Sequence, residues 1–197
     1  MVRHDTVNGV EFISREKRKE METLNLERIR DGFPGITPTV GGMLLEACLV
    51  CLEKQCHTPG AILHVYGDWN VEVELQWSTA VDDQMRRTWS NQDKMTEYAA
   101  TCLVVLLVDQ LTPYMVLGQA GKNTGIDYWL MSKSTQKIEE ASGRLEVSGI
   151  FSGTIAQITR RFQMKLIQSN QSDVTNLPAI IGIAEFSKPQ TQLETKK

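Results

Sequence analysis

Two short apolar runs, at the two ends of residues 125–150, constrain the fold more than any other feature of the sequence. The first run, Ile-Asp-Tyr-Trp-Leu, carries Asp127, and the second, Arg-Leu-Glu-Val-Ser-Gly-Ile, carries Glu146. Successive side chains of a strand point to opposite faces, so in each run most apolar residues share one face and the acid lies on the other. Polar and turn-forming residues join the runs, which predicts an antiparallel hairpin with a long loop.

This hairpin would bring Asp127 and Glu146 near each other on one face. Two carboxylates on adjacent strands suit a hard divalent cation, which takes oxygen ligands and keeps several waters. In a simpler interpretation both are solvated acids on a half-exposed hairpin, with Glu146 paired to Arg144. The residue types alone leave both interpretations open.

The composition is that of a globular chain and excludes one class of function. The 197 residues are 41% hydrophobic and 23% charged, enough for a buried core in one domain, with or without an appendage. The formal net charge of −3 argues against a non-specific coat for DNA, which requires a strongly basic surface. An enzyme with a local basic groove and a metal ion remains compatible with this charge.

The cysteines indicate a reducing compartment. The sequence opens without an apolar stretch of signal-peptide length, and no window is long enough for a membrane span. Four cysteines without a secretion signal predict a cytoplasmic protein with free thiols. Cys48, Cys51, Cys56 and His57 form a single cluster, whereas tetrahedral zinc usually takes ligands from two paired elements. Cys48 and Cys51 share a helical face with Leu44, so we expect buried cysteines that hold no metal.

Residues 1–36 form an N-terminal arm and a charged helix in this prediction: residues 1–13 are a flexible arm or an edge strand, and residues 15–30 are the helix. Leu24, Leu26 and Ile29 are the main large apolar residues of this helix and make a thin stripe. The stripe is expected to dock on the body of the protein, or else to bind a partner protein or a second copy of the chain.

The following segment predicts an N-terminal helical and hairpin extension to the main domain. Thr37 followed by proline is typical of a helix start, because the hydroxyl caps the helix and proline fits its first position. Arg86 and Arg87 end a short helix, where they are either solvated or form a small phosphate-binding patch. The expected elements are a helix over residues 37–57, a hairpin of residues 62–66 and 71–77, and a short helix over residues 80–89.

From residue 90 onward the pattern is helix, strand, strand, strand, helix, strand, which predicts an α/β (α+β) fold with a mixed sheet flanked by helices. Ser90 opens the first helix, whose apolar second half should be central, and Glu97 on it is either solvated or faces a site. Ser152 can cap the second helix, over residues 153–168. Residues 179–186 form a buried strand in this scheme, so a single domain spans residues 37–186, with residues 187–197 as a disordered tail.

This order of elements resembles the core of the PD-(D/E)XK nucleases, the restriction-endonuclease-like superfamily. That family places an acid at the start of the second core strand and an acid-x-lysine on the third, and often adds a glutamate from the first helix. Asp127, Glu146 and Glu97 stand at these places, and the resemblance covers about half the chain. Runs such as TGIDYWL, RLEVSGI and IIGIAEFSKP also resemble small bacterial proteins, a likeness that implies no activity.

The family resemblance implies a metal-dependent phosphodiesterase or nuclease, a hydrolase acting on DNA or RNA in bacterial defence or nucleic-acid processing. The implied ligands of Mg²⁺ or Mn²⁺ are Asp127, Glu146, the carbonyl of Val147 and, directly or through water, Glu97. The implied nucleic-acid contacts are Arg160, Arg161, Arg86 and Arg87.

One position departs from the family pattern. Ser148 stands where the family has its lysine, which orients the attacking water and offsets charge that builds at phosphorus. A serine donates a hydrogen bond but supplies no charge. Some family members move this duty to the following helix, where Lys165 or Gln163 can reach, and this interpretation gives a catalytic set of Asp127, Glu146, Ser148 and Lys165. The alternative is an inactive nuclease-like fold that serves as an interaction or scaffolding subunit of a larger complex.

Overall fold

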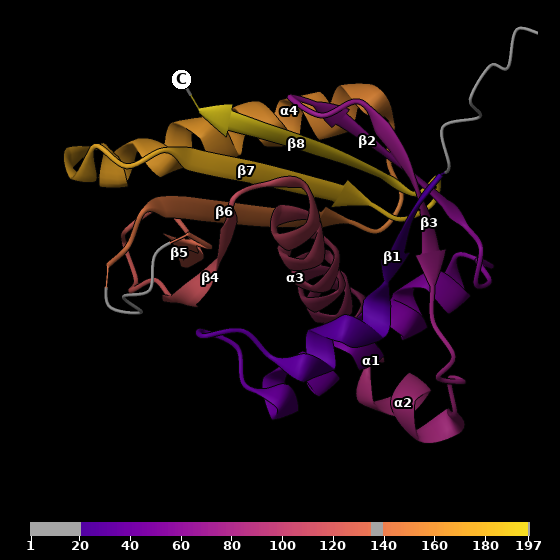
Figure 1. Ribbon diagram of the computed structural model, residues 1–197. Coiled ribbons are helices and arrows are strands. Elements are labelled where there is room, and N and C mark those ends of the chain that lie inside the picture. Colours follow the sequence, from indigo (N-terminus) through magenta and orange to yellow (C-terminus); the bar gives the residue numbers. More distant parts are fainter. Residues whose placement is uncertain (1–20, 135–139, 197) are drawn as a thin grey trace, which may run out of the picture.

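The computed structural model describes residues 21–134 and 140–196, in which eight strands form one mixed sheet with helices on both faces (Figure 1). The strands are β1 (Glu22–Asn25), β2 (Ile62–Gly67), β3 (Val71–Gln76), β4 (Tyr114–Gln119), β5 (Tyr128–Ser132), β6 (Gly143–Ile150), β7 (Ala179–Glu185) and β8 (Gln190–Lys196). The α-helices are α1 (Pro38–Lys54), α2 (Asp83–Thr88), α3 (Gln92–Leu111) and α4 (Ile155–Gln168), and two 3₁₀ helices are η1 (Leu26–Asp31) and η2 (Ser169–Thr175).

The strands follow the order β1-β3-β2-β8-β7-β6-β5-β4 across the sheet. β1 with β3, β2 with β8 and β6 with β7 are parallel neighbours, and the remaining neighbours are antiparallel. The predicted mixed α/β architecture is therefore confirmed, and so is the pairing of the two acid-bearing runs, because β5 and β6 are adjacent. The hairpin β2–β3 is also confirmed.

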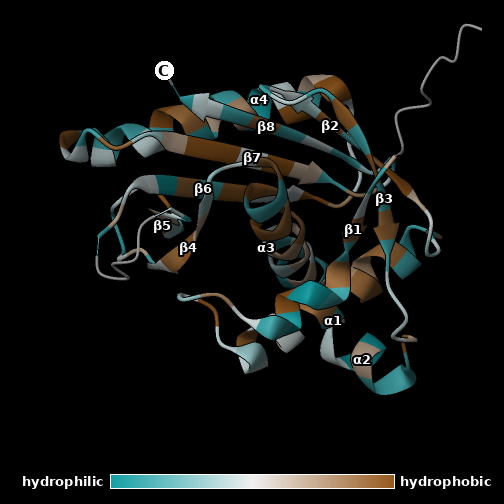
Figure 2. Ribbon diagram, in the orientation of Figure 1, coloured by the Kyte–Doolittle hydropathy of each residue, from teal (hydrophilic) through white to brown (hydrophobic). Residues whose placement is uncertain are grey.

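The helices lie on two sides of the sheet: α3 covers one face, with α1 packed against α3, and α4 covers the other face (Figure 1). β7 contributes side chains to the hydrophobic cores on both faces of the sheet. In Figure 2 the residues of β7 and α3 are largely apolar. Ile180 belongs to the large core that α1 and α3 fill, whereas Ile181 packs with Ile158 and Phe162 of α4. This alternation is the two-residue period of a strand that is buried on both faces.

Local capping explains where the helices begin. The Thr37 hydroxyl accepts a hydrogen bond from the main-chain N–H of Val40 at 3.3 Å, as expected from the sequence. Asn91, not Ser90, caps α3, and Thr154, not Ser152, caps α4 in a capping box with Gln157. Among the described residues, no helix combines the length and the apolar character that crossing a membrane requires.

The predicted helix over residues 15–30 is wrong for the part that the structure describes. Residues 22–25 are the edge strand β1, and residues 26–31 form the 3₁₀ helix η1; residues 15–20 lie outside the described range. Leu24, Leu26 and Ile29 are all buried in the main core. They therefore pack on the body of the protein, the first of the two expected arrangements, and do not offer a stripe to a partner.

The predicted disordered tail is also wrong. β8 lies between β2 and β7 in the interior of the sheet, so the sheet extends beyond residue 186. The carboxylate of Glu185 accepts hydrogen bonds from the main-chain N–H groups of Ser187 and Lys188, which turns the chain back toward β7. β8 carries one large apolar residue, Leu193, so its sequence is polar although its position is central.

The expected burial of Cys48 and Cys51 is confirmed. Cys48, Cys51 and Cys102 are buried free thiols, and Cys56 is an exposed one. Burial raises the pKa of the Cys51 thiol to about 12, so this side chain stays protonated at neutral pH. The absence of bound zinc stays a prediction, for which elemental analysis of protein purified without added metal is the test.

Candidate functional site

Two hydrogen bonds, one to the main chain and one to the side chain of Asp127, place this residue beside Glu146. Asp127 directly precedes β5, and its N–H donates to the carbonyl of Leu145 on β6 at 2.9 Å. The N–H of Val147 donates to Asp127 Oδ2 at 2.8 Å. Asp127 is therefore held by the two residues that flank Glu146. The two acids lie near each other, as expected from the sequence.

The carboxyl group of Glu146 is fully buried and faces α4. Its Oε1 accepts hydrogen bonds from Lys165 Nζ at 2.5 Å and from Gln168 Nε2 at 2.9 Å. Its Oε2 is buried and has no hydrogen-bond partner among the described residues. A buried carboxylate oxygen without a partner is costly, so this atom marks a place where a ligand would be stabilising.

The environment of Glu146 raises its pKa from 4.5 to about 7. Burial is the largest cause, because it disfavours the charged form, and the nearby charge of Asp127 acts in the same direction. The ammonium group of Lys165 opposes both effects but does not cancel them. A perturbed acid with a specific charge partner in a cleft is a mark of functional sites.

Asp127 lines a cleft of about 590 Å³ whose walls come from α3, β6 and α4. Gln92, Asp93 and Glu97 contribute from α3, and the other wall carries Arg161 and Lys165. Ser148 also lines the cleft, and its hydroxyl accepts a hydrogen bond from Arg161 Nη1 at 2.9 Å. The predicted residues Asp127, Ser148, Lys165, Arg161 and Glu97 thus reach one cleft, with Glu146 buried behind it.

The side chains that could hold a metal ion are two acids, not three. Within residues 21–134 and 140–196, no three His, Cys, Asp or Glu side chains gather into a metal-binding group. Glu97 is exposed and lines the cleft together with Asp127. Val147 directs its N–H to Asp127, and its carbonyl faces the same way because both groups of a strand residue leave the strand on one side.

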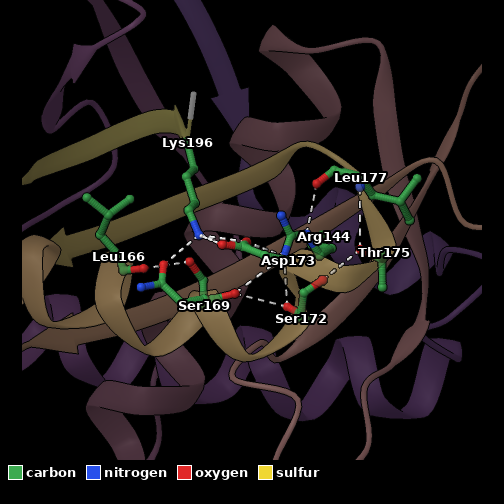
Figure 3. Close-up of polar contacts among 9 residues, drawn as sticks. Arg144, Leu166, Ser169, Ser172, Asp173, Thr175, Leu177 and Lys196 are labelled. Atoms are coloured by element: carbon green, nitrogen blue, oxygen red, sulfur yellow. Dashed lines mark hydrogen bonds and ion pairs between the residues drawn. The ribbon is translucent and has the colours of Figure 1, made fainter.

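Arg144 does not pair with Glu146, which removes the simpler interpretation of that acid. Figure 3 shows Arg144 among residues of η2, where its Nη1 lies 3.0 Å from Asp173 Oδ1 and 2.9 Å from Ser172 Oγ. Lys196 of β8 reaches the same carboxylate from the other side. This cluster ties η2 to β6 and β8 and is a structural contact, separate from the cleft.

The four predicted nucleic-acid contacts separate into two groups. Arg160 and Arg161 lie on α4, where they line a hollow next to the cleft together with Lys165. Arg86 and Arg87 lie on α2, which Figure 1 places on the other side of the sheet from α4. Arg86 forms ion pairs of 2.7 Å with both Glu53 and Asp83, which raise its pKa. Neither Arg86 nor Arg87 lines the cleft.

Sequence reasoning missed Gln168, which donates to Glu146. Its signal was present in the spacing, because Arg161, Lys165 and Gln168 are separated by four and three residues and so share a helix face. The other candidate of the helix, Gln163, is exposed and lines a different hollow, between α4 and β8.

The raised pKa predicts how stability depends on pH in the metal-free protein. Glu146 binds its proton more tightly when folded, so its contribution is complete below pH 4.5 and is lost as the pH rises through about 7. The loss is on the order of 3 kcal/mol. We expect Glu146→Gln to remove this part of the pH dependence, measured as urea midpoints at pH 5 and 8 in chelator. Asp31→Asn, which changes an exposed acid at the end of η1, is the control, and an unchanged pH dependence in Glu146→Gln would contradict the assignment.

Comparisons of the chain with protein-family models, with curated proteins and with solved structures found no match. A function for the cleft must therefore be argued from the chemistry of Asp127, Glu146 and Lys165 themselves.

Proposed function

We propose that the protein is a metal-dependent phosphodiesterase that cleaves nucleic acid in the cleft between α3 and α4. One contact carries the proposal. Lys165 of α4 donates to Glu146 beside Asp127, so a cation stands next to the acid pair although Ser148 occupies the position of the family lysine. A pair of acids can hold the metal ion, and an adjacent cation can offset charge that builds on the phosphate, which are two contributions to metal-assisted phosphodiester hydrolysis.

The residues fit a Mg²⁺ or Mn²⁺ ion. Glu146 Oε2 is buried without a partner, Asp127 lies beside it, and the Val147 carbonyl faces the same side. Mg²⁺ in proteins is commonly held by one or two carboxylates and keeps several waters, a donor set that these groups match. Asp127, Glu146 and the Val147 carbonyl would hold the ion, and Glu97 would reach it through water. When bound, the ion would lower the proton affinity of a water and neutralise charge on a phosphate.

The chain's own groups divide the remaining work. Val147 N–H fixes Asp127 Oδ2, which leaves the other carboxylate oxygen to face the site. Lys165 supplies the positive charge that Ser148 lacks, and it can hold a water or a phosphate oxygen. Arg161 uses Nη1 for the Ser148 hydroxyl, so its remaining N–H groups can bind a second phosphate oxygen. Ser148 thus positions the arginine and carries no charge of its own.

The relative importance of Lys165 and Ser148 tests this division. With Mg²⁺ or Mn²⁺ and a labelled DNA or RNA strand, Lys165→Ala is expected to slow cleavage roughly 100-fold, the loss typical of one transition-state donor. Ser148→Ala should stay within about tenfold of the wild type, because it loses only the group that orients Arg161. Cleavage should stop when the metal is chelated. Equal effects of the two substitutions, or cleavage in chelator, would contradict the assigned roles.

The second candidate is an inactive nuclease-like fold that serves as an interaction subunit. The observation in its favour is the outer face of α4, where Met164 and Ile167 are 57% and 68% exposed. Such a protein would bind a partner and cut nothing. If metal-loaded protein cleaves neither single-stranded nor duplex nucleic acid, catalysis is excluded and Asp127 and Glu146 remain as a relic of an ancestral site.

A further inference from the structure

The cleft continues on the far side of Asp127 into a second hollow of about 380 Å³. Glu97, Asp127 and Val147 line both hollows, so the two join at Asp127. Pockets that hold small ligands begin at roughly 300 Å³, so the second hollow can take one unit the size of a nucleotide. We call the hollow with Lys165 the first arm and this one the second arm.

The wall of the second arm is the segment that joins β4 to β5, and this segment is well tied. Ala120 N–H donates to the carbonyl of Asp127 at 2.8 Å, and the Thr124 hydroxyl donates to the carbonyl of Gly121 at 2.8 Å. Gly125 has a positive φ of 71°, and a Cβ there would meet the Gln168 carbonyl at 2.1 Å, so only glycine fits. The segment therefore presents a formed surface next to the acids.

The lining of the second arm matches a nucleobase and a phosphate. Gln119 and Asn123 bring side-chain amides, which offer both donors and acceptors, as the edges of bases do. Tyr98 adds an aromatic ring, and stacking of a base on an aromatic side chain is sequence-tolerant. Lys122 places a cation here, while Arg161 and Lys165 place cations in the first arm. Positive charge thus lies on both sides of the acid pair, as a strand that passes through would need.

We propose that the second arm is a subsite for one unpaired nucleotide, so that a single strand crosses the acid pair and is cut at an internal bond. This inference rests on the proposed function, because it takes the acids as the place of cleavage. A pocket of this shape fits a base that has left its stack, whereas the bases of a duplex are paired and stacked on their neighbours. Single-stranded nucleic acid is therefore the substrate class that the two arms favour.

A substitution at Gly121 tests the subsite without disturbing the fold. Gly121 lines the second arm, and a Cβ added there would meet nothing within 4 Å, so Gly121→Leu adds a large side chain at the wall of the arm without a clash. Gly42 on α1 has the same open surroundings, which makes Gly42→Leu the matched control. The probe is a fluorescent oligothymidylate of about 12 nucleotides, within the ~4–16 that single-strand-binding folds cover, with Ca²⁺ in place of Mg²⁺. Gly121→Leu is expected to weaken binding ~10-fold, as loss of one stacked base does, and Gly42→Leu to bind as the wild type does.

The outcomes for the subsite and for catalysis are separable. Binding by Gly121→Leu equal to the wild type, or tighter wild-type binding of the matching duplex than of the single strand, overturns the subsite and leaves the cleavage assay to decide the proposed function. Weaker binding by Gly121→Leu supports the subsite even if no metal supports cleavage, and then catalysis alone is lost. A wild type that cuts a covalently closed single-stranded circle supports internal cleavage, and one that cuts only linear strands overturns it.

Discussion

Asp127→Asn and Glu146→Gln are each expected to abolish metal-dependent cleavage of nucleic acid. Each variant keeps the shape of its side chain but leaves a single carboxylate, which holds a strongly hydrated ion poorly. Removing a residue that only hydrogen-bonds to a metal ligand lowers activity roughly 10- to 100-fold. The loss of activity in these two variants should be larger, because their side chains would contact the ion themselves. The measurement is cleavage of a labelled strand in Mg²⁺ and in Mn²⁺, with metal affinity determined by calorimetry.

Two controls show whether a loss of activity comes from the site itself and not from a loss of charge elsewhere or of the fold. Glu72→Gln removes an exposed acid of β3 that does not line the cleft, and should cut as the wild type does. Urea unfolding of both site variants shows whether the fold survives, and Glu146→Gln should be no less stable than the wild type at pH 8 because it removes a buried, repelled charge. A folded Asp127→Asn with full activity would refute the metal site.

Removal of residues 190–197 is expected to unfold the protein. β8 shares seven residue pairs with β7 and four with β2, so its loss would divide the sheet in two and leave unpaired edges within the core. A domain is stable by only about 5–15 kcal/mol, which the loss of an interior strand exceeds. Circular dichroism and urea titration should show no cooperative unfolding transition in the shortened chain.

A point substitution tests the same strand in the full-length chain. Leu193 is fully buried, and Leu193→Asp places a charge in the core, which costs several kcal/mol beyond the roughly 2–5 kcal/mol of Leu→Ala. Lys188→Ala, in the exposed turn before β8, is the control and should unfold within about 0.5 kcal/mol of the wild type. If the shortened chain and Leu193→Asp both unfold like the wild type, β8 does not hold the sheet together.

The main elements between residues 37 and 186 followed from local signals. Thr37 and proline mark the start of α1, and alternation of apolar residues marks β3 and β5. These signals act within a few residues, so they are legible in a sequence. β1 and β8 were not predicted because their composition resembles that of an exposed segment. They are strands because they pair with neighbouring strands of the sheet. Within β8, the single large apolar residue, Leu193, is the one sequence feature that indicates a buried strand.

Within the candidate site, Asp127 and Glu146 were predictable as neighbours because a single hairpin joins their strands. The roles of Lys165 and Gln168 depend on how α4 is rotated about its axis. That rotation is set by Ile158 and Phe162, which pack on the outer face of β7 and so turn Lys165 toward Glu146.

The sequence by itself determined the mixed α/β class, the start of each main helix within a few residues, and the pairing of the two acid-bearing strands. All of these depend on contacts between residues close in the chain. Only the tertiary structure decided that β8 is interior, that Arg144 pairs with Asp173 and not Glu146, and that Lys165 stands beside the acids. These features join residues far apart in the chain, and packing selects among partners that the local sequence permits equally.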